Sequence, residues 1–230
     1  MQATGRKFQK AALGVAFFLF ALILIPFRAQ AAPAQDLALI AAAERGDGAA
    51  VQTLLREGAS IDARDARGRT ALLAATQADR VETARLLIAA GADVNAKDAI
   101  ADSPFLYAGA EGRNEILKMT LAAGADLDST NRYGGTALIP AAHHGHVETV
   151  RILLATAIDK DHVNNLGWTA LLEAVILGDG GPAHTEIVRL LAAAGANVNL
   201  ADRDGVTPLA HARRRGFVAI ARILETAGAR

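Results

Sequence analysis

Cysteine is absent from this chain of 230 residues, and aromatic residues are few. Without cysteine the protein has neither disulfide bonds nor a lipoprotein anchor, so its stability must come from packing. One Trp, two Tyr and seven Phe are too few to line a large aromatic pocket. The sequence also lacks Asn-X-Ser/Thr sequons. The absence of cysteine and of sequons fits a bacterial periplasm better than a eukaryotic secretory pathway.

Neither sign of charge is in excess, because 24 Lys and Arg balance 24 Asp and Glu. All four charged residues within 1–31 are basic, so the rest of the chain carries 20 Lys and Arg against 24 Asp and Glu. Nucleic-acid binding requires a basic surface. We therefore expect no nucleic-acid partner.

The N-terminal segment has the three parts of a secretory signal peptide. Arg6, Lys7 and Lys10 precede an apolar run over 11–25, and the small residues Ala29 and Ala31 follow it. A run of 15 residues is shorter than the roughly 20 that span a bilayer, although an uncleaved anchor stays open as the alternative. We expect a signal peptide over 1–31, cleavage after Ala31, and a periplasmic product that no longer contacts the membrane.

The remaining chain repeats itself with a period of 33 residues. Sliding the sequence by 33 places Thr136 on Ser103, Thr70 and Thr169. In the copy over 129–161, a Gly-containing turn at 132–135 precedes Thr136, which can N-cap a short helix that ends at Gly145. A second amphipathic helix follows from about residue 147. Neither helix can bury its apolar face within one copy, so the copies must stack.

Three copies depart from this pattern. In the third, Ala101 replaces the turn glycine and Thr120 takes a core position, where we expect its hydroxyl to bond the carbonyl one turn back. In the fourth, Ala157 replaces a loop glycine and Pro140 falls in the first turn of the first helix. The fifth has five extra residues, 179–183, whose glycines and proline predict a loop between its helices.

Turn, cap, helix pair and Gly-Ala-Asp loop recur in phase over about residues 36–230, and in this the sequence resembles the ankyrin repeat family. The resemblance implies an all-α solenoid of about six helix-turn-helix repeats whose β-turns project as fingers. The expected segments are a signal peptide (1–31), an N-terminal capping repeat (32–62), four internal repeats (63–199) and a C-terminal capping repeat (200–230).

One departure concerns the family's Thr-Pro-Leu-His motif, which has lost its His in every copy. We expect apolar packing to replace the polar network of that His at Leu73, Leu106, Ile139, Leu172 and Ala210.

The resemblance also implies that another protein binds the fingers and the ends of the first helices. The fingertip positions correspond to Arg67, Arg69, Ile100, Asp102, Arg132, Tyr133, Leu166, Trp168, Arg203 and Asp204. The helix ends correspond to Gln77, Glu111, His143, His144, Ile176 and Leu177.

Among these residues, Tyr133 and Trp168 stand out because interface energy concentrates in Trp, Tyr and Arg. We expect one aromatic patch bordered by Arg132 and Leu166, with residues 179–183 walling the same groove. The alternative is that each aromatic packs on the neighbouring finger.

No catalytic residue, metal ligand or cofactor site is predicted. His143, His144 and His146 could supply zinc ligands, but neighbouring side chains on a helix point apart and no Cys joins them. Two function classes stay open. The favoured one is a monomeric, non-catalytic periplasmic module that binds another protein, supporting a stress-defence protein or neutralising a toxin as an immunity protein. The alternative is a metal- or cofactor-dependent enzyme built on the groove.

Overall fold

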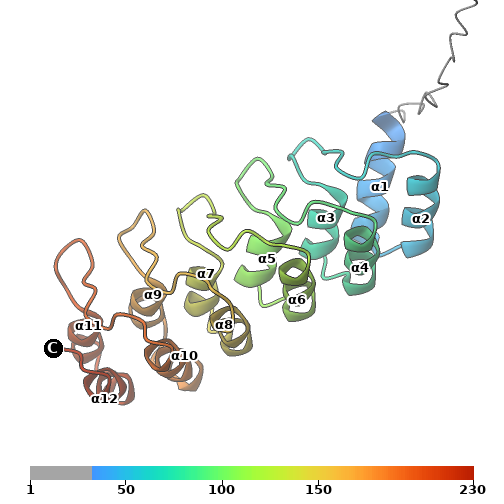
Figure 1. The fold of residues 1–230 in the computed structure, drawn as a ribbon. Helices are drawn as coiled ribbons and strands as arrows, with labels where there is room; N and C mark the ends of the chain where they lie inside the picture. Colours follow the sequence, from blue (N-terminus) through green and yellow to red (C-terminus); the bar gives the residue numbers. More distant parts are fainter. Residues whose placement is uncertain (1–32) are drawn as a thin grey trace, which may run out of the picture.

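A computed structural model describes residues 33–230, so the predicted signal peptide lies outside the described residues. Within this range the chain forms twelve helices and no strand, and the helices fall into six consecutive pairs (Figure 1). The helices are α1 (Pro33–Arg45), α2 (Gly48–Arg56), α3 (Ala71–Gln77), α4 (Val81–Ala89), α5 (Pro104–Ala110), α6 (Asn114–Ala122), α7 (Leu138–His143), α8 (Val147–Leu154), α9 (Ala170–Ile176), α10 (Pro182–Ala193), α11 (Pro208–Arg214) and α12 (Val218–Thr226).

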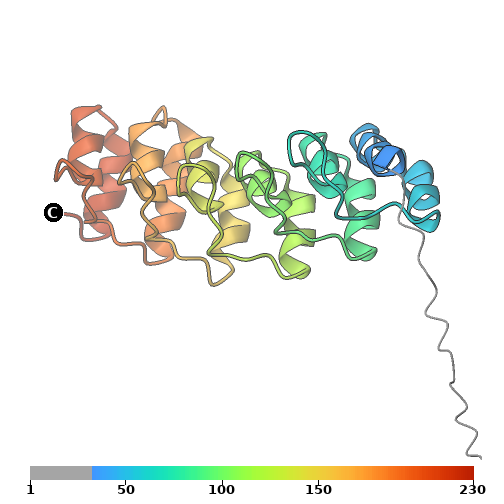
Figure 2. The same cartoon turned by 90° about the horizontal axis from the view of Figure 1, so that it is seen from above.

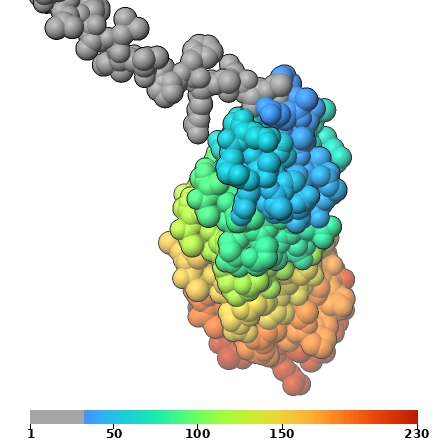
Figure 3. All heavy atoms as spheres, turned by 90° about the vertical axis from the view of Figure 1, so that its right-hand side faces the viewer, coloured from blue at the N-terminus to red at the C-terminus, as the bar shows by residue number. Residues whose placement is uncertain are grey.

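The helices form two layers that run along the whole stack. The odd-numbered first helices pack on one another in order, and the even-numbered second helices do the same (Figures 1 and 2). Seen along the stack, the repeats lie one behind another without a break (Figure 3). One hydrophobic core therefore continues from Leu39 in α1 to Leu224 in α12. This is the all-helical solenoid that the period predicted.

Small residues let the first helices approach closely. Buried alanines recur on α1, α3, α5, α7, α9 and α11. At Gly109 in α5, a Cβ atom would lie 2.8 Å from the Ala137 Cβ, which is closer than such atoms pack. The first-helix layer is therefore compact, and the longer Leu and Ile side chains fill the space toward the second helices.

The turns that project from the stack share one hydrogen-bond pattern. We call residues 64–70, 97–103, 130–136, 163–169 and 201–207 the fingers (Figure 1). In each finger, Oδ1 of one Asp or Asn accepts the backbone N–H groups two and four residues later, at 2.9–3.1 Å. The acceptors are Asp65, Asp98, Asn131, Asn164 and Asp202. An Asp or Asn side chain at the equivalent position thus holds each finger, and the residues between the two N–H groups that it binds lie at the tip of the turn.

Ala101 stands where the other fingers have glycine. Gly134 and its counterparts adopt positive φ, and Ala101 adopts the same left-handed conformation with φ of 65°. An L-residue with a Cβ is strained in this region. The third finger thus keeps the common turn against the preference of its sequence.

The hydroxyl caps form as expected in four repeats. Oγ of Ser103 accepts the Leu106 N–H at 3.2 Å, and the hydroxyls of Thr70, Thr169 and Thr207 do the same three residues on. Each first helix after a finger is thereby tied to its turn, with one exception.

Thr136 is that exception, and the prediction that it caps the fourth first helix is wrong. Its hydroxyl is buried and has no hydrogen-bond partner. In the other repeats a backbone N–H four residues after the cap donates to the cap's carbonyl, as Ala74 does to Thr70 at 3.0 Å. Pro140 holds that place here and has no N–H. The Ile139 N–H therefore donates to the Thr136 carbonyl at 3.2 Å, and the hydroxyl loses its donor.

One other local prediction is met, and a neighbouring repeat shows a bond that was not predicted. The Thr120 hydroxyl is buried and donates to the Leu117 carbonyl at 2.8 Å, so this polar group in the core is satisfied. In the fourth repeat, where Ala157 replaces the loop glycine, Thr156 serves as the cap. The Thr156 Oγ1, just after α8, donates to the Leu153 carbonyl at 2.6 Å and accepts the Ile158 N–H at 3.2 Å, so it binds both sides of the turn that follows the helix.

The extra residues of the fifth repeat do not all form a loop, contrary to the prediction. Pro182 and Ala183 begin α10, which has 12 residues, against 9 in α4. Proline is tolerated there because the N–H groups of the first turn have no intrahelical partner. The loop ends at Gly181, and the remaining residues lengthen the second helix.

The lost His positions are filled by buried apolar groups at Leu73, Leu106, Ile139 and Leu172, as expected. At Ala210 the expectation is wrong, because this residue is exposed on α11 of the last repeat. However, the next position supplies a polar link to the finger in two repeats. The Asn164 amide donates to Oε1 of Glu173 at 2.8 Å, and Nε2 of His211 lies 2.7 Å from Oδ2 of Asp202. The next position thus provides a polar link in repeats five and six, and in repeat five this link adds to the apolar packing of Leu172.

Candidate functional site

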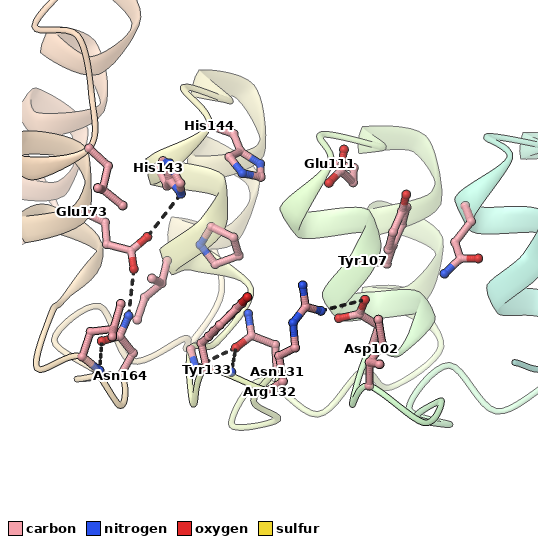
Figure 4. Close-up of a pocket in the computed structure, with 17 residues that line it drawn as sticks. Asp102, Tyr107, Glu111, Asn131, Arg132, Tyr133, His143, His144, Asn164 and Glu173 are labelled. Atoms are coloured by element: carbon pink, nitrogen blue, oxygen red, sulfur yellow. Dashed lines mark hydrogen bonds and ion pairs between the residues drawn. The ribbon is translucent and has the colours of Figure 1, made fainter. Parts of the chain in front are cut away.

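A groove of about 560 Å³ lies between the fingers and the first helices of the middle repeats (Figure 4). The fingers of repeats three to five form one side, and residues of α5, α7 and α9, with Gln77 at the end of α3, form the other. Ten positions expected at the binding surface line it: Gln77, Ile100, Asp102, Glu111, Arg132, Tyr133, His143, His144, Leu166 and Leu177. Seven lining residues were not expected: Tyr107, Asn131, Gly135, Ile139, Pro140, Asn164 and Glu173.

The remaining expected positions lie away from this groove, namely Arg67, Arg69, Trp168, Ile176, Arg203 and Asp204. Residues 179–183 do not line it either, so they do not form its wall.

Arg69 is not an exposed fingertip, which corrects the expectation for this residue. Its side chain is buried, with 5% of its surface accessible. The guanidinium meets Asp65 at 2.8 Å and Glu44 of α1 at 3.2 Å. Because these carboxylates neutralise the arginine, it stays inside the protein and joins the first two repeats.

Tyr133 and Trp168 do not share the groove, so the expected aromatic patch does not form there. Trp168 is half-buried and follows the finger glycine Gly167, whereas Tyr133 precedes the finger glycine Gly134. The two side chains therefore leave different points of their turns. The second aromatic group in the groove is Tyr107 of α5, so both tyrosines of the chain line it.

Exposed apolar surface is concentrated in the groove. Among residues 33–230, seven large apolar side chains are exposed, and four of them line it: Ile100, Tyr133, Leu166 and Leu177. Soluble proteins rarely gather exposed apolar groups in one place without a binding role.

Carboxylates outnumber permanent cations in the groove. Asp102, Glu111 and Glu173 line it, with Arg132 as the one Lys or Arg. The Arg132 guanidinium lies 4.8 Å from the centre of the Tyr133 ring and 3.7 Å from Oδ2 of Asp102. Burial raises the pKa of Asp102, the Asp98 and Glu111 carboxylates raise it further, and Arg132 acts in the opposite direction. The groove is thus net acidic.

Glu173 is the most deeply buried carboxylate of the site, with 6% of its surface accessible. Oε1 accepts the Asn164 amide bond, and Oε2 lies 3.7 Å from Nδ1 of His143 (Figure 4). Burial raises the pKa of Glu173 to about 7, although the Asn164 bond favours the charged form. Burial and the neighbouring His144 and His184 lower the pKa of His143. Near neutral pH, Glu173 is therefore only partly ionised, and the neutral form of His143 is favoured.

His144, at the end of α7, and His184 of α10 each link their helix to the end of a neighbouring first helix. A ring nitrogen of His144 lies 2.8 Å from the Ala110 carbonyl oxygen, and a ring nitrogen of His184 lies 2.9 Å from the His143 carbonyl oxygen.

In the described part of the chain, no three His, Asp or Glu side chains are grouped to hold a metal ion. No helix within residues 33–230 combines the length and apolar character of a membrane span.

The architecture defines a class: a stack of helix pairs that presents a finger-lined groove. The family model for ankyrin repeats matches residues 13–98 and 105–202, so the chain belongs to the ankyrin repeat family. A solved ankyrin repeat domain from Acinetobacter baumannii AYE is 60% identical, with a TM-score of 0.82, and the alignment covers 84% of this chain and 98% of that one.

Two more distant similarities agree with this assignment. The ankyrin repeat domain of Bcl-3, a member of the IkappaB protein family, is 29% identical over 84% of this chain and 86% of that one, with a TM-score of 0.75. YahD of Escherichia coli (strain K12), a curated ankyrin repeat protein, is 51% identical over 57 residues, which are 25% of this chain and 28% of YahD. Ankyrin repeats generally mediate protein–protein interactions and generally serve as non-catalytic scaffolds.

Proposed function

We propose that this protein is a non-catalytic periplasmic module that binds another protein through the groove. The observation that carries the proposal is the gathering of Ile100, Tyr133, Leu166 and Leu177 at one site. They are four of the seven large apolar side chains that are exposed among residues 33–230. Such a cluster with a polar rim is typical of a protein contact surface.

The fingers suit this role because they are fixed before the partner arrives. Asn131 and Asn164 each hold two N–H groups of their own finger, and the Asn165 N–H donates to the Tyr133 carbonyl of the preceding finger at 2.9 Å. A preorganised surface loses little entropy on binding. We also propose that the protein acts as a monomer.

The signal peptide expected over 1–31 supports a periplasmic location. We take two kinds of partner as candidates: a stress-defence protein that the module supports, and a delivered toxin that it neutralises as an immunity protein. Either partner would use the same groove.

The proposal is tested by affinity capture from the periplasm with the tagged full-length protein, produced in its own host. A double Tyr133→Ala, Leu166→Ala variant should lose the captured partner, and its affinity for that purified partner should fall by at least about 2 kcal/mol, the usual size of a hot-spot loss. Val218→Ala is the matched control, because Val218 is exposed on α12 and lies outside the groove. Circular dichroism should show that both variants are folded.

Trp168→Ala distinguishes the groove from the fingers as a whole. Trp168 does not line the groove, so its truncation should weaken binding less than Tyr133→Ala. A folded Tyr133→Ala, Leu166→Ala variant that retains full affinity would refute the groove as the binding site.

A further inference from the structure

Glu173 is a nearly buried carboxylate that is only half satisfied. Of its two oxygens, Oε1 accepts the Asn164 amide, whereas no donor within the described residues is hydrogen-bonded to Oε2. The carboxylate lines the groove, and Figure 4 shows it on the side of α9 that faces α7. A buried carboxylate normally accepts several hydrogen bonds. Oε2 is not one of the fully buried atoms without a partner, so it reaches the groove, where a donor from outside the chain can meet it.

We propose that the groove binds a lysine or arginine side chain of the partner protein, with the cationic group on Oε2 of Glu173. This inference rests on the proposed function, because it names the chemistry of the partner at the same groove. The apolar residues Ile139, Pro140 and Leu177 line the groove as well and can pack along the aliphatic stem of that side chain.

Among residues 33–230, no Lys or Arg pairs with Oε2. Only His143 approaches it, with Nδ1 at 3.7 Å, which is beyond hydrogen-bonding distance, and burial favours the neutral form of this histidine. His184 on α10 lies against Asp179 and the His143 carbonyl. Arg215, from the segment after α11, donates to the backbone carbonyls at the end of α9. The cations packed around α9 are thus directed elsewhere.

The finger does not need a carboxylate at this position. A Gln side chain would accept the Asn164 amide bond equally well and would avoid the cost of burying a charge. Three equivalent first-helix positions hold Ala74, Tyr107 and Pro140, and their fingers keep the same turn without such a link. Only the fourth, His211, also contacts its finger, at Asp202. Because the turn does not require a carboxylate here, the Glu173 carboxylate is available to a cation from outside the chain.

The other end of the groove already shows the proposed chemistry. There, the Arg132 guanidinium lies over the Tyr133 ring and beside the Asp102 carboxylate. With Glu111 also on the rim, the groove keeps an excess of negative charge after Arg132 is counted. Charge complementarity thus favours a basic segment over an acidic one.

The test uses a displayed library of short random peptides as the probe, selected on the full-length protein. The selected peptides should share a Lys or Arg, and their affinity is then measured by calorimetry at about pH 8, where Glu173 is ionised. Glu173→Gln should weaken binding by about tenfold or more, as expected for loss of a charge-assisted hydrogen bond. Glu148→Gln is the matched control, since Glu148 is an exposed acid on α8 outside the groove.

A second measurement isolates the contact. Replacing the peptide's Lys or Arg by norleucine should cost the same factor against the wild-type protein and almost nothing further against Glu173→Gln. Peptides that lose binding to Tyr133→Ala, Leu166→Ala but have no basic residue, or are indifferent to Glu173→Gln, would overturn this inference and leave the proposed function standing. A selection that yields no groove-dependent peptide would count against both.

Discussion

The Asn164 amide nitrogen donates a 2.8 Å hydrogen bond to Oε1 of Glu173, so the finger of the fifth repeat is joined to the helix that it precedes. The same Asn164 uses its own Oδ1 to hold the N–H groups of Leu166 and Trp168. One side chain thus links the shape of the fingertip to the only deeply buried carboxylate among the groove-lining residues.

Glu173→Gln should stabilise the protein at neutral and alkaline pH. The pKa of Glu173 is about 7 in the folded state, against 4.5 for an unperturbed side chain. Between these values the unfolded chain binds fewer protons than the folded one, so the free energy of unfolding falls as pH rises from about 4.5 to 7. The Gln variant escapes this loss and should gain about 2–3 kcal/mol above that window, and almost nothing below it.

Denaturant titrations of both proteins at acidic and alkaline pH measure this difference. Glu148→Gln, at an exposed site, should show little difference between the two pH values. Equal stability of wild type and Glu173→Gln at all pH values would mean that burial does not perturb the Glu173 carboxyl.

Thr136→Val should be neutral or stabilising, by up to about 1 kcal/mol. The Thr136 hydroxyl is buried without a partner, so an isosteric methyl group removes an unsatisfied polar atom. Thr169→Val is the matched control and should cost about 1 kcal/mol, because that hydroxyl accepts the Leu172 N–H. Urea unfolding of the two variants gives the comparison, and equal losses in both would contradict the role assigned to Pro140.

Ala101→Gly should stabilise the third finger by about 0.5–1 kcal/mol. The left-handed conformation at φ of 65° costs alanine more than glycine, and this gain exceeds the entropy that glycine adds to the unfolded chain. Ala99→Gly, in the same finger but without positive φ, should be destabilising instead. Thermal or chemical unfolding separates the two, and the account fails if both substitutions have the same sign.

The precursor should be cleaved after Ala31 and the product recovered from the periplasm. The basic start, the short apolar run and the small residues at Ala29 and Ala31 occur in the order that export requires. N-terminal sequencing of the protein from fractionated cells measures this. Intact protein starting at Met1 in the membrane fraction would favour the anchor.

The sequence was sufficient for the solenoid because its signals are local and repeated. A hydroxyl residue such as Thr70 or Thr169 begins four of the first helices by accepting an N–H three residues later, and the period of 33 places these signals in phase. The failure at Thr136 has an equally local cause. The missing N–H of Pro140 shifts the Ile139 donor, which a helix boundary predicted from capping residues alone does not take into account.

The residues of the groove were harder to predict from the sequence than the fold. Fingertip positions placed Tyr133 and Leu166 in the groove, but Tyr107 and Glu173 lie within first helices whose other residues form the core. A polar residue among apolar helix positions was the signal that could have revealed Glu173. The burial of Arg69 depends on Glu44, 25 residues away in another repeat, and no local pattern contains that contact.

In each finger, the groups that hold the turn and the side chains that form its outer surface belong to different residues. In the fourth finger, Asn131 and Gly134 hold the turn, whereas the side chains of Arg132 and Tyr133 take no part in holding it. Residues at these two places can therefore be exchanged during evolution without loss of the turn. A change of partner requires new side chains only, and the same scaffold can acquire a new specificity while its stability is inherited unchanged.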